Sequence, residues 1–279
     1  MKRTLFILLL FSPLLSTSQT LGEDFDFLLY LSGNQMRDEA VELVKGLRIE
    51  NDSANFMKGL AYYGAHRLDT ASHYYSLVGK ASPLHTEAVF FNALSQAHLK
   101  RYTAALTTLS EIESTDTAVA NLQAFEAAGM HLLRRDLRSF DSCFSLLHTG
   151  DYRIESEAMK LLELRNTIAD RKDKKPWMAA GMSALVPGLG KIYAGNLGEG
   201  ISAFILTGSL IGVTAENWYR EGLKNWKTIL FGTIATVFYI GNIYGSAVTV
   251  SVSKETFNNE TDLTILYNIH IPLRNSFRR

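Results

Sequence analysis

The chain of 279 residues contains one cysteine, Cys143, and only five prolines. A single cysteine excludes an internal disulfide and any metal site built from several thiolates. The seven histidines are scattered, without the spacing of a metal site. A phosphate loop ending at Gly190-Lys191 would need glycine at 185 and a hydroxyl residue at 192, where Leu185 and Ile192 stand. We therefore expect no catalytic, cofactor-binding or metal site, and predict that the protein is not an enzyme.

The chain also lacks an excess of either charge, since 28 basic residues balance 28 acidic ones. The two signs are unevenly distributed. Residues 22–170 carry 14 Lys/Arg and 21 Asp/Glu, whereas residues 171–279 carry 12 and 7. Nucleic-acid binding needs a concentrated basic face, and the larger part of the chain is acidic. The composition therefore argues against a nucleic-acid partner and indicates two regions of different character.

The first 20 residues have the layout of a secretory signal peptide. The basic start Met1-Lys2-Arg3 precedes the apolar run 4–15, and the small residues Ser16 and Ser18 follow. The apolar run is short for a membrane span. We predict cleavage after about residue 18 and export of the remaining chain. The alternative is an uncleaved anchor, which also places the following residues outside the cytoplasm.

Residues 21–170 repeat with a period of about 34 residues. Four positions that recur at steps of 31, 34 and 35 residues are Ala40, Ala71, Ala105 and Phe140. A small residue stands twelve positions before the last three of them, at Gly59, Ala93 and Ala128. Small residues at these points let two antiparallel helices approach closely, so the pattern predicts stacked helix pairs.

Residues 55–78 and 88–112 resemble tetratricopeptide repeats, with Gly59, Tyr62 and Ala93 at the family's small and aromatic positions. No unit begins with tryptophan or regularly ends with proline, which departs from the family pattern. The resemblance implies a curved helical scaffold whose concave face binds peptides or proteins, with residues 153–169 as a closing helix. The tyrosines that are candidates for partner binding are Tyr62, Tyr63, Tyr74 and Tyr75. The alternative is that most of them belong to the core between helices.

The composition changes after the basic junction 171–175. The runs Gly200–Ala215 and Thr228–Ser253 contain no charge over 16 and 26 residues, and they predict membrane spans at about 199–219 and 228–250. Each run contains a pair of glycines four residues apart, Gly208/Gly212 and Gly241/Gly245. Because apolar burial does not drive association in lipid, we expect these glycines to mediate helix packing.

Residues 177–195 are interrupted at Pro187-Gly188, so we expect two half-helices or an interfacial helix and a turn. With residues 238–245 they resemble a bacterial membrane-module family that often follows tetratricopeptide repeats in envelope proteins. Lys191 stands where this family usually has glutamine. The residues of this sequence that carry the resemblance are Pro187, Gly188, Gly190, Tyr193, Gly195, Tyr239, Gly241, Asn242 and Gly245. Inside a membrane the Asn242 amide needs a partner, either as a contact between helices or as part of a transport site.

Residues 254–279 form the tail. Leu263, Ile265, Tyr267, Ile269 and Ile271 occupy alternate positions, which predicts a short β-strand. Charge does not decide between two spans, which leave this tail outside the cytoplasm, and three spans, which place it inside. We favour two spans because Pro187 and the neighbouring glycines interrupt the third candidate.

The sequence thus predicts an all-α protein: a tetratricopeptide-like solenoid, a transmembrane helical hairpin and a short β-like tail. The expected segments are a signal peptide (1–20), the repeat domain (21–170), the membrane module (171–253) and the tail (254–279). We expect an adaptor in the bacterial inner membrane, with its repeats on the periplasmic side, that binds envelope proteins or peptides and contacts lipid. The alternative is a component that assists transport or membrane-protein insertion through a polar pocket in the hairpin.

Overall fold

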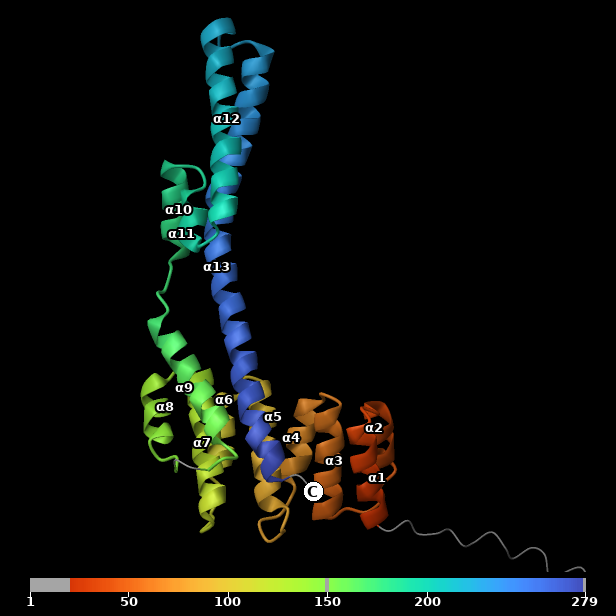
Figure 1. Ribbon diagram of the computed structural model, residues 1–279. Helices are drawn as coiled ribbons and strands as arrows, with labels where there is room; N and C mark the ends of the chain where they lie inside the picture. Colours follow the sequence, from red (N-terminus) through yellow and green to blue (C-terminus); the bar gives the residue numbers. More distant parts are fainter. Residues whose placement is uncertain (1–20, 149–150, 278–279) are drawn as a thin grey trace, which may run out of the picture. The chain divides into compact units, whose positions relative to one another are not determined.

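The computed structural model describes residues 21–148 and 151–277, and all regular secondary structure in this part of the chain is helical (Figure 1). The expected all-α class is therefore confirmed, while the expected signal peptide, 1–20, lies outside the described residues. The chain divides into two compact units. Unit 1 comprises the residues up to Leu161 together with those from Leu266 onward, and unit 2 comprises Leu162–Ile265.

Unit 1 is built from consecutive short helices. They are α1 (Leu21–Gly33), α2 (Arg37–Lys45), α3 (Asp52–Gly64), α4 (Leu68–Ser76), α5 (His85–His98), α6 (Tyr102–Leu109), α7 (Thr117–Leu133) and α8 (Leu137–Phe144). Each packs against the next, and α3 also contacts α1 and α5 (Figure 1). The first turns of α9 (Glu155–Asp170) belong to the same unit, where Ala158 and Leu161 are buried.

Four turns of unit 1 share one backbone geometry. The second residue after the end of α1, α3, α5 and α7 has a positive φ of 57–61° in each case. These residues are Gln35, His66, Lys100 and Arg135. In each case the following N–H donates to the carbonyl five residues earlier, as Arg67 does to Tyr62 and Arg101 to Gln96. This is the hydrogen-bond pattern of a left-handed helix C-terminus. The four positions are 31, 34 and 35 residues apart, so the period of the side-chain pattern reappears in the backbone.

The recurring residues of the repeat pattern lie in the interior of unit 1. Ala40, Ala71, Ala105 and Phe140 are all buried. A Cβ atom on Gly59 would lie 2.6 Å from the ring of Tyr75, which is buried between α3 and α4. A larger side chain at residue 59 would therefore push α4 away from α3.

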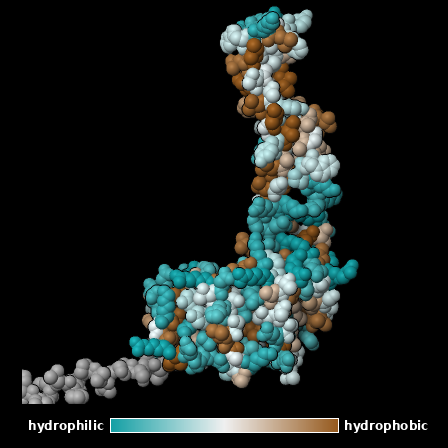
Figure 2. All heavy atoms as spheres, turned by 180° about the vertical axis from the view of Figure 1, so that it is seen from behind, coloured by the Kyte–Doolittle hydropathy of each residue, from teal (hydrophilic) through white to brown (hydrophobic). Residues whose placement is uncertain are grey.

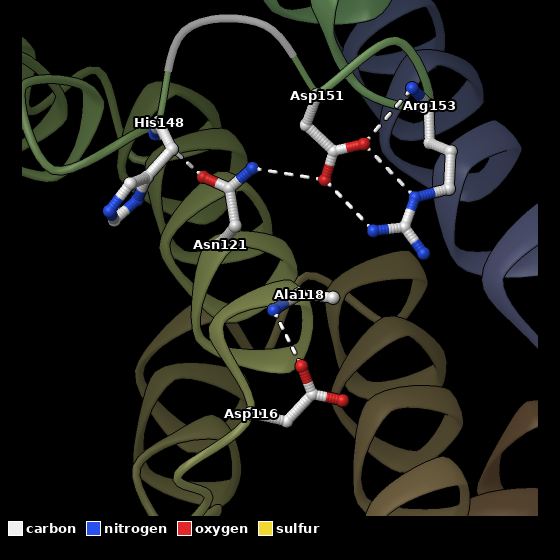
Figure 3. Close-up of polar contacts among 6 residues, drawn as sticks. All are labelled: Asp116, Ala118, Asn121, His148, Asp151 and Arg153. Atoms are coloured by element: carbon white, nitrogen blue, oxygen red, sulfur yellow. Dashed lines mark hydrogen bonds and ion pairs between the residues drawn. The ribbon is translucent and has the colours of Figure 1, made fainter.

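A polar network ties the chain around residues 148 and 151 to α7 (Figure 3). The buried Asn121 side chain accepts a hydrogen bond from the His148 N–H at 2.9 Å and donates one to Asp151 at 3.2 Å. Two further bonds, of 3.0 and 3.1 Å, join Arg153 to Asp151. The Arg153 side chain lowers the pKa of Asp151, which keeps this carboxylate charged. The network thus fixes the start of α9, the helix expected to close the repeats.

Unit 2 contains the rest of α9, the short helices α10 (Pro176–Leu185) and α11 (Leu189–Ala194), the helix α12 (Leu197–Glu221) and most of α13 (Trp226–Ser276). α12 and α13 are long and apolar enough to cross a membrane, and they contain the two expected spans. Their apolar side chains are largely exposed, including Phe204, Ile211 and Val237. Figure 2 shows this exposed apolar surface in brown, in contrast to the mostly hydrophilic surface of the repeat helices.

The expected β-strand over residues 263–271 is wrong, because α13 continues as one helix to Ser276. The alternation that suggested a strand hides a helical pattern, since the buried aliphatic residues are Ile265, Leu266, Ile269 and Leu273. These positions fall on one face of a helix. The boundaries also differ from those expected. Residues 254–265 belong to unit 2 and the residues from 266 onward to unit 1, and the first boundary falls inside α9 rather than at residue 170.

Candidate functional site

One face of unit 1 is formed by α3, α5 and α7 and carries the C-terminal segment, which we define as residues 266–277. Each of the three helices contributes a contact. Tyr63 of α3 stacks on His270 with 6.0 Å between ring centroids, and Tyr63 Oη lies 3.1 Å from His270 Nδ1. Phe90 of α5 lies 5.7 Å from Phe277 between ring centroids. We call this surface the α3–α5–α7 face.

The contact with α7 depends on a glycine. A Cβ atom on Gly129 would lie 2.4 Å from Ile269 Cγ2, so Ile269 occupies the space that a side chain at residue 129 would need. Ile269 is 0% exposed, as is Leu273 one turn later, whereas Tyr267 is 65% exposed. The C-terminal segment thus packs within unit 1 as a helix that buries Ile269 and Leu273 and exposes Tyr267, Arg274 and Asn275.

The α3–α5–α7 face also holds titratable groups whose burial disfavours their charged forms. Glu126 of α7 is buried, its Oε1 atom has no hydrogen-bond partner, and burial raises its pKa well above the usual value. Burial is also the main cause that raises the pKa of Tyr63. Burial is also the main cause that lowers the pKa values of His98 and His270. Burial therefore disfavours charge on this polar face.

We expect Glu126→Gln to stabilise unit 1, and more so at pH 8 than at pH 5. Because the folded pKa of Glu126 is raised, folding above the unfolded value of about 4.5 takes up a proton, and this cost grows as the pH rises. Glutamine removes the cost. Urea unfolding of the full-length protein in detergent, followed by circular dichroism at both pH values, measures it. The exposed Glu113→Gln is the control, and a stabilisation by Glu126→Gln that does not vary with pH would contradict this assignment.

The four tyrosines expected to bind a partner occupy different places. Tyr63 lies on the α3–α5–α7 face. Tyr75 belongs instead to the core, where it is buried and packs against Phe56. Tyr62 and Tyr74 stack on each other across α3 and α4 with 5.6 Å between ring centroids. Tyr63 is therefore the tyrosine of this set for which a contact with the C-terminal segment is described.

The sequence reasoning did not identify Phe90, Glu126 and Gly129 as residues of this face. Glu126 gives a usable signal, since it is a lone acid in the otherwise uncharged helix α7. Gly129 gives one too, because glycine is disfavoured inside a helix unless something approaches it closely. The C-terminal segment that meets them begins more than 130 residues later, and no local pattern indicates that contact.

In unit 2 the chain forms two short helices, α10 and α11, which are separated at the motif residues Pro187 and Gly188. Gly188 has a positive φ of 87°, and a Cβ atom there would lie 2.0 Å from the Gly200 carbonyl oxygen. A Cβ atom on Gly190 would lie 2.0 Å from the Ala179 carbonyl oxygen. Gly195 ends α11 with a φ of 111°. Pro187 and these glycines thus permit a close turn that brings α10, α11 and α12 together.

Hydroxyl groups connect this turn to α13. The Gly190 N–H donates to Ser183 Oγ at 2.9 Å, and Ser183 Oγ lies 2.7 Å from Ser246 Oγ. Tyr239 Oη donates to the Ala184 carbonyl, and Tyr193 Oη accepts from the Lys175 N–H at 3.2 Å. Both motif tyrosines therefore satisfy backbone groups at the ends of α10. Ser246 was not identified from the sequence.

Asn242 lines a cavity of about 650 Å³ between α12 and α13. It is 7% exposed, and neither its Oδ1 nor its Nδ2 atom has a hydrogen-bond partner. Lys191 and Glu199 line the same cavity and form an ion pair at 3.5 Å. These polar groups share the cavity with apolar residues such as Leu206, Val237 and Phe238.

The structure does not show the helix packing that was expected at the two glycine pairs. A Cβ atom on Gly208, Gly212 or Gly241 would meet nothing within 4 Å. On Gly245 it would meet only the Lys191 side chain, at 3.9 Å. The pairs were identified from spacing alone, and spacing does not say whether a helix faces the glycines.

Among residues 21–148 and 151–277, no group of three or more His, Cys, Asp or Glu side chains is placed to hold a metal ion. The chain matches no protein-family model, no curated protein and no solved structure in comparisons with each of the three.

Proposed function

We propose that the protein is a membrane-anchored adaptor of the bacterial envelope, and that its α3–α5–α7 face binds an amphipathic helix of a partner protein. The observation that supports this most is the C-terminal segment on that face. A surface that buries Ile269 against Gly129 and stacks His270 on Tyr63 has the shape and chemistry to accept a helix.

The resemblance to tetratricopeptide repeats supports the same proposal. The four turns with a common geometry give four helix pairs, α1–α2, α3–α4, α5–α6 and α7–α8. The α3–α5–α7 face is formed by the first helix of three successive pairs. In a tetratricopeptide scaffold we expect these first helices to line the concave, partner-binding side.

The position of the C-terminal segment favours two membrane spans. The segment contacts the repeat helices inside unit 1, so we expect both to lie on the same side of any membrane that the chain crosses. The chain between them, residues 162–265, then crosses an even number of times. α12 and the first part of α13 supply two crossings. With the expected signal peptide, the repeats and the C-terminal segment lie in the periplasm, and the loop around Lys224 in the cytoplasm.

A partner helix competes with the C-terminal segment for this face. We therefore expect the partner to repeat the segment's pattern, with large apolar residues at the spacing of Leu266, Ile269 and Leu273 and polar residues on the opposite side. Because the segment belongs to the same chain, its effective concentration is high, and intact protein binds such a helix weakly until the segment is displaced.

Binding of a labelled peptide with the sequence of residues 260–279 tests this proposal. Full-length protein in lipid nanodiscs is compared with a variant that ends at Ile265. We expect the shortened protein to bind at least about tenfold more tightly, because its α3–α5–α7 face is empty. Adding Gly129→Leu to the shortened protein should abolish binding. A shortened protein that does not bind the peptide would contradict the proposal.

The second candidate function is assistance in membrane transport or membrane-protein insertion, and Asn242 is the observation that favours it. Its unpartnered amide and the Lys191–Glu199 pair line one cavity. Asn242→Ala distinguishes the two functions. We expect an adaptor with this substitution to keep its capture of partner proteins from membranes, whereas a transport component should lose activity while its thermal stability is unchanged.

A further inference from the structure

A basic cavity of about 310 Å³ lies in unit 2 where the apolar part of α13 ends. Val250 and Phe257 supply apolar walls, and Arg171, Lys172, Lys174 and Lys254 supply positive charges. Thr228–Ser253 contains no charged residue, and Lys254 is the first one after it. If α13 crosses a membrane, as proposed above, this cavity lies at the level of the lipid headgroups.

The charges around the cavity are not balanced. The only acid among its lining residues is Asp173, which pairs with Lys254 at 3.0 Å. Lys174 Nζ donates to the Ala194 carbonyl at 3.1 Å. Glu199 and Glu260 line a different cavity. The lining of this cavity thus holds four cations and one acid, and an excess of positive charge favours an anion.

Arg171 is held in position with part of its hydrogen-bonding capacity unused. Its guanidinium lies 3.7 Å above the Phe257 ring, and its Nη2 atom donates to the Ser253 carbonyl at 3.2 Å. Its Nη1 atom is buried and has no partner. Stacking on an aromatic ring fixes the plane of a guanidinium, and the nitrogen that no protein group uses can donate a charge-assisted hydrogen bond to a phosphate oxygen.

We propose that this cavity binds the phosphate of an anionic phospholipid. Arg171 is its main ligand, and Lys172, at the same junction, adds charge. The neighbouring apolar wall, Val250 and Phe257, suits the glycerol and first acyl carbons of a lipid better than a free phosphate ion. The proposal depends on membrane insertion of α12 and α13, and it is independent of what binds to the α3–α5–α7 face.

Native mass spectrometry of the full-length protein tests the site. Protein is extracted from vesicles of equal parts phosphatidylglycerol and phosphatidylcholine, and the ratio of retained lipids is measured. We expect wild type to retain phosphatidylglycerol preferentially. Arg171→Gln/Lys172→Gln should reduce that preference about fivefold for each charge removed. Arg220→Gln/Lys224→Gln, which removes two charges near the loop between α12 and α13, is the matched control and should leave it unchanged.

Phe257→Leu is a second variant that keeps every charge and removes the ring beneath Arg171, and it should weaken the preference about two- to threefold. Millimolar inorganic phosphate should not release the bound lipid. Equal losses in the test and control variants would refute the site, because the general positive charge of the protein would then explain the lipid preference. Release of the bound lipid by inorganic phosphate would also refute it. Extraction of wild type from membranes by carbonate would instead refute the membrane anchoring. Membrane-bound protein with an unchanged lipid ratio in the double variant would refute the headgroup site alone.

Discussion

Ile269→Asp should release the C-terminal segment from the α3–α5–α7 face. The isoleucine is completely buried and fills the space beside Gly129, so a carboxylate there would be desolvated without a partner. Detachment of the segment avoids that cost and exposes Leu266, Ile269 and Leu273. Each buried aliphatic side chain contributes about 1.5–3 kcal/mol, from which the entropy of ordering the segment is subtracted. We expect a net loss of about 2–4 kcal/mol of docking free energy.

Hydrogen exchange of the full-length protein in nanodiscs measures this loss. We expect amides of residues 266–277 to exchange about 30- to 900-fold faster in Ile269→Asp, as a loss of about 2–4 kcal/mol implies. Tyr267→Asp is the matched control, since it adds the same charge two residues away at a position that is 65% exposed. Exchange that rises equally in both variants, or in neither, would mean that burial of Ile269 does not hold the segment.

Gly190→Leu should disrupt the membrane module. A Cβ atom at residue 190 would lie 2.0 Å from the Ala179 carbonyl oxygen and 2.6 Å from Ser183 Oγ, and the glycine N–H itself donates to that hydroxyl. Backbone atoms cannot move aside as a flexible side chain does. α11 must therefore separate from α10, with loss of the bonds through Ser183. We expect a destabilisation of at least about 3 kcal/mol.

The matched control for this variant is Gly208→Leu, because a side chain there meets nothing within 4 Å. The same holds for Gly241→Leu, although the spacing of Gly241 and Gly245 alone suggests a packing contact. Membrane accumulation and thermal unfolding in detergent compare the three proteins. We expect a large loss only in Gly190→Leu. A comparable loss in Gly208→Leu or Gly241→Leu would show that the glycine pairs mediate a contact outside the single chain.

Features that depend on short sequence distances were predicted well. The repeats were visible because each helix packs on its neighbour, which fixes the small residues Gly59 and Ala71 at twelve residues apart. The break at Pro187-Gly188 was visible because proline and a positive φ leave a local signal. The two long apolar helices were visible because runs without charge are rare outside membrane spans and buried cores.

Features that depend on distant contacts were not predicted. Residues 263–271 satisfy both a strand and a helix pattern, and the helical continuation of α13 decides between them. The partner of Gly129 is Ile269, 140 residues further along the chain, so nothing near Gly129 shows why a glycine is present. Four tyrosines likewise looked equivalent in sequence, and only packing separates Tyr63 on the face from Tyr75 in the core.

Photo-crosslinking tests the contact on which the proposed function depends. p-Benzoylphenylalanine is placed at Phe277, whose ring lies 5.7 Å from that of Phe90, and crosslinked peptides of the full-length protein in nanodiscs are identified by mass spectrometry. We expect crosslinks within one chain to residues 85–98 of α5, and none to the repeat helices when the photoreactive residue replaces the exposed Tyr267. Failure of position 277 to crosslink to α5 would contradict the account.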